Sequence, residues 1–156
     1  MLEANFMREA LELAEKRMLA GDGGPFGAVI VADGEIVGRG WNRVTSTCDP
    51  TAHAEVCAIR DACTKLKRFS LKGCVLYSSC EPCPMCLAAI LWARLDEVIF
   101  AAGCEDAAAA GFDDGHFYRQ VALPIEKREL PMRQQLREEG KRVFDAWLKF
   151  EDRVEY

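Results

Sequence analysis

The sequence predicts a single α/β domain in which helices cover both faces of a mixed β-sheet. Its 156 residues match the length of one domain. Two apolar runs flank Asp33-Gly34, a dipeptide that favours a two-residue turn between antiparallel strands. A strand–helix–strand pattern then covers residues 74–102, and such a unit requires parallel pairing of its strands. A hairpin joined to a parallel unit gives a mixed sheet between helices.

The first half of the chain contains two predicted helices and the hairpin. Residues 2–20 place apolar side chains at helical spacing. The hairpin strands are expected at 28–31 and 35–40. Asp49 and Pro50 are typical of a helix start, as an N-cap followed by a proline in the first turn. Apolar residues then follow one helical face through Ala52, Val56, Ile59, Cys63 and Leu66.

The second half begins with the parallel unit. Residues 74–79 form a strand-like apolar run, Pro84 can start a helix that reaches Arg94, and residues 98–102 form the next strand. Residues 103–125 carry no clear pattern. A last helix is expected where bulky apolar residues gather near the end of the chain, at Phe144, Trp147, Leu148 and Phe150.

Composition and charge exclude several classes of function. Twenty basic against 25 acidic residues give a net charge of −5, which argues against electrostatic binding to nucleic acid phosphates. The longest charge-free run, 82–93, has 12 residues, too few to span a membrane. Charged residues recur from Glu3 to Lys16, where a secretion signal would need an apolar stretch. We therefore expect a cytoplasmic protein with eight reduced cysteines.

Three residues have the types and the spacing of zinc ligands. His53 lies at the start of one expected helix, and Cys83 and Cys86, flanked by prolines, lie at the start of another. Two thiolates and one imidazole cancel the charge of Zn²⁺ and leave one coordination position open, as in catalytic sites. Water in that position loses a proton near neutral pH. The sequence therefore predicts one catalytic zinc ion per chain.

Glu55 follows His53 by two residues and has a different predicted role. Residues i and i+2 do not share a helix face, so Glu55 is not expected to bind the same ion. A carboxylate beside the metal can instead take a proton from water and pass it on. His-x-Glu together with Pro-Cys-x-x-Cys is the pattern of zinc nucleobase deaminases.

Spacing alone leaves other interpretations open. Cys80 and Cys83 form a second pair at the same spacing, and Cys57 lies one helical turn after His53. The chain could also be a thiol redox protein, or a zinc-stabilised binding module without turnover, which would not need Glu55. The cysteines outside the predicted site are expected to be packed thiols: Cys48, Cys57, Cys63, Cys74 and Cys104.

At these residues the sequence resembles the cytidine deaminase-like zinc superfamily. The similarity covers most of the chain, and its segments look like those of short, zinc-dependent bacterial guanine deaminases. It is carried by 23–31, Asn42, 49–55, 79–86 and 110–114. This resemblance implies a three-layer α/β/α sandwich with a mixed five-stranded sheet, with residues 1–156 as one deaminase domain.

The resemblance also implies roles for individual residues. Zinc would be bound by His53, Cys83 and Cys86, while Glu55 shuttles protons. Asn42 would hydrogen-bond the purine. Asp114 would recognise the polar edge of guanine and pass protons to the departing amine. Three further residues are expected to contact the flat base, namely Phe26, Ala54 and Trp92.

A homodimer is expected from the same resemblance. The C-terminal segment, about 140–156, can cross to a partner subunit in this family, with Tyr156 closing the neighbouring pocket. His116, in Gly115-His116-Phe117, departs from the family pattern, and we expect either a surface residue or a change in substrate preference.

The resulting hypothesis is a hydrolytic deaminase that converts guanine to xanthine and ammonia. Guanosine, cytosine, adenine, tRNA adenosine and aminotriazines are alternative substrates. The tRNA alternative is the weakest, because a surface that follows phosphates should be basic.

Overall fold

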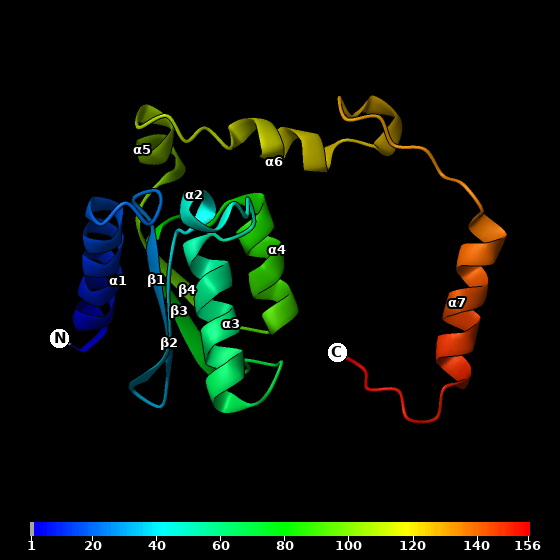
Figure 1. Ribbon diagram of the computed structural model, residues 1–156, viewed down its shortest axis with the longest axis horizontal. Coiled ribbons are helices and arrows are strands. Elements are labelled where there is room, and N and C mark those ends of the chain that lie inside the picture. The colour runs from blue at the N-terminus through cyan, green and yellow to red at the C-terminus, as the bar shows by residue number, and fades with distance from the viewer. Residues whose placement is uncertain (1) are drawn as a thin grey trace. The chain divides into compact units, whose positions relative to one another are not determined.

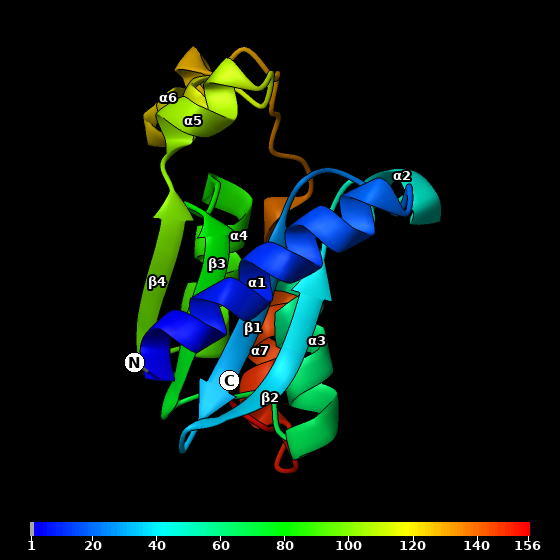
Figure 2. The same cartoon turned by 90° about the vertical axis from the view of Figure 1, so that its left-hand side faces the viewer.

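The computed structural model describes residues 2–156, which divide into two compact units, one ending at Tyr118 and the other covering Arg119–Tyr156. The first unit holds a four-stranded mixed sheet in the order β2-β1-β3-β4 (Figures 1 and 2). The strands are β1 (Gly27–Ala32), β2 (Glu35–Trp41), β3 (Cys74–Cys80) and β4 (Glu97–Ala102). None of the described helices is both long and apolar enough to cross a membrane.

The predicted hairpin is confirmed. β1 and β2 pair antiparallel, with Ala32 opposite Glu35. The two turn residues have positive φ angles, 50° at Asp33 and 79° at Gly34, as a two-residue turn of type I′ requires. β1 also pairs antiparallel with β3, which places the hairpin beside the parallel unit.

The parallel unit is confirmed too, but the sheet has four strands where five were expected. β3 and β4 pair in parallel, and α4 (Pro84–Ala93) connects them. After β4 the described residues form helices, beginning with α5 (Cys104–Ala109). Alanine-rich sequence favours helix over strand, and the Asp106 carboxylate accepts a hydrogen bond from the Gly103 N–H at the start of α5.

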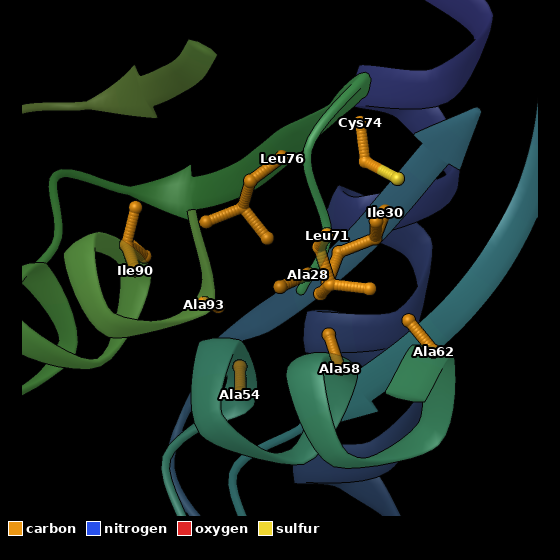
Figure 3. Packing of buried hydrophobic residues seen from close by; sticks show 10 residues of the cluster. All are labelled: Ala28, Ile30, Ala54, Ala58, Ala62, Leu71, Cys74, Leu76, Ile90 and Ala93. Carbon is orange, nitrogen blue, oxygen red and sulfur yellow. The ribbon is translucent and has the colours of Figure 1, made fainter. Parts of the chain in front are cut away.

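Alternation along β1 supplies two apolar faces, each covered by helices. Val29 and Val31 face α1 (Leu2–Leu19) and pack with Ala10. Ala28 and Ile30 face the opposite side. There they meet α3 (Ala54–Leu66) and α4, so the first unit has the expected three layers (Figures 1 and 3).

α3 approaches the sheet unusually closely because small residues line both surfaces. Every fourth residue of the buried helix face is an alanine, at Ala54, Ala58 and Ala62, and each is fully buried (Figure 3). They lie over Gly38 and Gly40 of β2. A Cβ atom on Gly38 would come within 2.6 Å of the Ala58 carbonyl oxygen, and one on Gly40 would overlap the Ala54 carbonyl oxygen. This contact fixes the position of the N-terminal turn of α3.

The second unit is helical. α6 (Gly115–Ala122) begins in the first unit and ends in the second, and is followed by a short 3₁₀ helix (Ile125–Lys127) and α7 (Arg137–Lys149). The predicted last helix is therefore confirmed, except that Phe150 is its C-cap. Bulky apolar side chains of α7 are strongly exposed, with values of 68% for Val143, 72% for Phe144 and 64% for Leu148.

Candidate active site

His53, Cys83 and Cys86 are far apart in the sequence, and the fold brings their ligand atoms together. Nδ1 of His53 lies 3.7 Å from Sγ of Cys83 and 3.5 Å from Sγ of Cys86. All three atoms lie within 4.8 Å of one another. Tetrahedral zinc, with Zn–S of about 2.3 Å and Zn–N of about 2.0 Å, holds a sulfur and a nitrogen about 3.6 Å apart. The arrangement therefore fits a zinc ion.

Two helix N-termini carry the ligands. His53 is the N-cap of α3 and Cys83 the N-cap of α4, and both have extended backbone angles. Pro84 occupies the first turn of α4, where its missing N–H costs no hydrogen bond. The positive ends of the two helices favour anionic sulfur at this place.

α3 begins later than the sequence predicted. Asp49 does not cap a helix: its carboxylate accepts hydrogen bonds from the N–H and the hydroxyl of Thr51, at 2.8 and 2.6 Å. The Ala52 N–H then donates to the Asp49 carbonyl, which closes a turn. Asp49-Pro50 is thus a turn signal here, and α3 starts only at Ala54. This shift places His53 at the helix end, facing the cysteines.

The two sulfurs share a hydrogen bond that sets their acidity. The Cys86 thiol donates to Cys83 and lowers the pKa of Cys83 to about 4. The same hydrogen bond, reinforced by burial, raises the pKa of Cys86. A hydrogen bond with the Cys83 sulfur raises the pKa of His53. Zinc binding would replace the shared proton, since thiolate and neutral imidazole are the forms that bind the ion.

Glu55 lies against this group without belonging to it. The side chain is only 6% exposed, and burial raises the pKa of its carboxyl group. The Cys86 sulfur is within hydrogen-bonding reach of that carboxyl group. A buried carboxyl group with a raised pKa can both accept and release a proton near neutral pH, which suits a proton-transfer role.

Asn42 is buried, and hydrogen bonds hold its side-chain oxygen in one position. The side chain is 7% exposed, and its Oδ1 atom accepts hydrogen bonds from the backbone N–H groups of Gly24 and Val44, at 3.1 and 3.2 Å. Because two donors fix the oxygen, the Nδ2 amide group is the one left to donate. The backbone of Asn42 also donates to the Phe26 carbonyl at 3.0 Å, which joins two predicted substrate residues.

Phe26 is half-buried and packs against an aromatic residue from a distant segment. Its ring meets Phe112 edge-on, with 4.9 Å between centroids and 86° between planes. Gly24 lies beside both rings, and a Cβ atom there would come within 3.3 Å of Phe26. The loop carrying Phe26 and the Phe112–Asp114 segment are therefore in contact.

Asp114 immediately precedes α6, accepts its first backbone hydrogen bonds through its carbonyl oxygen, and is half-buried. Partial removal from water raises the pKa of Asp114, and the negative charge of Cys83 raises it further. His116 is half-buried two residues later, with its ring 6.0 Å from that of Phe117.

Three other predicted substrate residues differ in their surroundings. The Ala54 side chain is fully buried in the apolar core, so only its backbone can face a ligand. Trp92, on α4, is 63% exposed, with the Arg94 guanidinium 5.6 Å from its ring. Tyr156 is in the second unit and is 74% exposed.

One residue near the site had no signal in the sequence. The Tyr118 hydroxyl donates a hydrogen bond to the Pro82 carbonyl oxygen at 2.7 Å, across 36 residues. Pro82 directly precedes the candidate ligand Cys83. Periodicity and motif spacing cannot reveal a contact of this range.

Together, the fold and the three-ligand centre define a zinc deaminase of the cytidine deaminase type. The chain belongs to the family described as the cytidine and deoxycytidylate deaminase zinc-binding region, whose profile matches residues 2–102. The α/β class and the zinc cofactor that the sequence predicted are confirmed. The prediction of packed thiols is wrong for Cys48 and Cys104, which are exposed because each lies at the end of a short helix that has no buried face.

Individual relatives extend the comparison. The chain is 52% identical to guanine deaminase of Bacillus subtilis over 151 residues, 97% of each protein. The crystal structure of a B. subtilis guanine deaminase superposes with a TM-score of 0.95, covering 98% of both chains at 51% identity. A tRNA-specific adenosine deaminase of Aquifex aeolicus is 44% identical over 97 residues, 62% of this chain and 64% of that protein.

Proposed function

We propose that the chain catalyses the hydrolysis of guanine to xanthine and ammonia with the help of zinc. The observation that carries this proposal is the extent of the similarity. The match to guanine deaminase covers 97% of the chain, whereas the match to the A. aeolicus tRNA deaminase covers 62%. The net charge of −5 also argues against a polynucleotide substrate.

In the proposed reaction, water forms a bond to C2 of guanine and the bond from C2 to the exocyclic nitrogen breaks. Zinc, when bound to His53, Cys83 and Cys86, supplies a nucleophile at neutral pH and stabilises developing negative charge. Glu55 takes a proton from the attacking water and delivers it to ring nitrogen N3. Asp114 assists a second transfer that lets the amine leave as ammonia.

Other residues hold the base in place. The Nδ2 group of Asn42 donates to an acceptor atom of the purine, because its Oδ1 atom is already occupied. Phe26 supplies an apolar wall, and its edge-on contact with Phe112 sets the orientation of that wall. The backbone of Ala54 and the ring of Trp92 complete the contacts proposed for the substrate.

A substrate panel tests this assignment. Protein carrying one zinc ion per chain is assayed for ammonia release from guanine, guanosine, cytosine, adenine and a tRNA anticodon stem-loop, with products identified by chromatography. Guanine should give the highest kcat/KM and yield xanthine. Zinc binding without ammonia release from any substrate would favour a binding module, and guanine ranking last would contradict the substrate assignment.

We further propose that the active form is a homodimer in which the C-terminal segment, about 140–156, covers the partner subunit's site. Apolar side chains of α7 that a monomer leaves exposed support this, with Val143, Phe144 and Leu148 each at least 64% exposed. Leu91 of α4 is exposed to a similar extent, at 63%. Exposed apolar side chains gathered on one element are typical of an interaction site.

Mixing two inactive variants tests the exchange. In a swapped dimer of one Glu55→Gln chain and one Tyr156→Ala chain, one site has an intact Glu55 and receives an intact Tyr156. In an unswapped dimer neither site is intact. Refolding the two variants together should therefore restore roughly a quarter of the parent activity. Activity no higher than the mean of the separate variants would contradict the exchange.

A further inference from the structure

The hydrogen bond from Tyr118 links the two segments that carry the chemistry of the site. Its acceptor, the carbonyl of Pro82, is buried and immediately precedes Cys83. Its donor lies in α6, and the distance of 2.7 Å is the usual value for a hydroxyl donor. The bond therefore joins the loop before α4 to the first turns of α6.

Asp114 lies in the same helical turn as Tyr118. The Asp114 carbonyl accepts hydrogen bonds from the N–H groups of Phe117 and Tyr118, at 2.9 and 3.2 Å. These two hydrogen bonds tie the Asp114 backbone to the residues that carry the Tyr118 ring. The hydrogen bond of the Tyr118 hydroxyl group therefore restrains Asp114 relative to the loop that carries Cys83.

Two other contacts of this segment involve residues that precede Asp114 in the chain. The Cys104 N–H donates to the Glu81 carboxylate at 3.1 Å, at the far end of the segment near β4. The ring of Phe112 packs against the ring of Phe26. Such a ring contact is less directional than a hydrogen bond and restrains the backbone less. Neither contact orients the turn that starts at Asp114.

We propose that Tyr118 is a positioning residue, whose hydrogen bond to the Pro82 carbonyl holds Asp114 beside the metal centre. The catalytic part of this inference rests on the proposed function, in which Asp114 assists departure of the amine. The structural part, that the hydroxyl restrains the first turn of α6, does not depend on the substrate.

Tyr118→Phe removes only the hydroxyl group, and Tyr77→Phe is the matched control. Tyr77 is 4% exposed and packs against α1 on the opposite face of the sheet. In zinc-loaded protein, Tyr118→Phe should speed amide hydrogen exchange over residues 114–118 several-fold and leave the zinc content at that of the parent. It should lower kcat/KM for guanine by about three- to tenfold, the usual worth of one hydrogen bond. Tyr77→Phe should change none of these.

An Asp114→Asn background shows whether the effect runs through Asp114. If Tyr118 acts by positioning that carboxylate, adding Tyr118→Phe to Asp114→Asn should lower the residual kcat/KM by less than twofold. A full, additive loss would overturn the proposal, as would unchanged hydrogen exchange in Tyr118→Phe or loss of its zinc. If the parent protein does not deaminate guanine, the proposed function fails, and the exchange measurement still decides whether Tyr118 restrains the turn.

Discussion

Replacing Gly40 with alanine should move the N-terminal turn of α3 and with it the catalytic residues. The new Cβ atom would lie 3.0 Å from the Ala58 Cα and overlap the Ala54 carbonyl oxygen. Carbon atoms need about 3.5–4.0 Å, so the helix has to retreat by about 1 Å. Overpacking of this kind costs about 2 kcal/mol in the free energy of unfolding. For a chain of this size that lowers the melting temperature by about 4–8 °C.

The loss of activity should exceed what this destabilisation explains. Ala54 lies between His53 and Glu55, and a misplacement of about 1 Å at a reacting group can cost about 100-fold in rate. Gly38→Ala presses on Ala58 and Ala62, farther along α3, with contacts of 2.6 and 2.7 Å. It should destabilise the chain similarly but lower kcat/KM by less than about tenfold.

Thermal unfolding and steady-state kinetics on zinc-loaded protein check both variants. A Gly40→Ala variant with the melting temperature and kcat/KM of the parent would refute the packing argument. If Gly40→Ala and Gly38→Ala lowered kcat/KM equally, the packing of Gly40 against α3 would not be what positions His53 and Glu55.

Three further predictions follow from the site. Glu55→Gln should keep one zinc ion per chain, measured by atomic absorption, while the rate of ammonia release falls by about 10²–10⁴-fold. A rate loss below tenfold would argue against proton transfer by Glu55. Asn42→Asp keeps an oxygen for the Gly24 N–H, at 3.1 Å in the parent, but removes the free donor. Its melting temperature should stay near that of the parent while KM for guanine rises about 10- to 100-fold, and an unchanged KM would count against the assigned donor. In zinc-depleted protein at pH 6, the pKa of about 4 keeps Cys83 a thiolate. Peptide mapping should therefore find Cys83 alkylated by iodoacetamide before the exposed Cys48, and the reverse order would contradict the assigned acidity.

Local signals in the sequence predicted most of the first unit. A two-residue hairpin turn requires positive φ angles at both central residues, and Asp33-Gly34 is a dipeptide that adopts them readily. The hairpin could therefore be predicted from this dipeptide and the apolar runs beside it. The helix at 84–94 was recognisable because Pro84 suits a first turn and the following residues are apolar. The zinc ligands were predictable because ligand chemistry restricts both residue type and spacing.

Features that depend on competing or distant interactions were not predictable. Asp49-Pro50 satisfies the rules for a helix start and for a turn, and only the hydrogen bonds to Thr51 decide between them. The donor atom of Asn42 depends on two backbone N–H groups, one of them 18 residues away. The contact of Tyr118 with Pro82 follows from the packing of α6, for which residues 103–125 offered no pattern.

The most direct test of the account is X-ray absorption at the zinc edge of the purified protein, combined with the metal content per chain. We predict one zinc ion per chain with two sulfur neighbours, one imidazole nitrogen and one further light atom from solvent. Four sulfur neighbours, or a zinc content unaffected by His53→Ala, would contradict the assignment of His53, Cys83 and Cys86 as the metal centre.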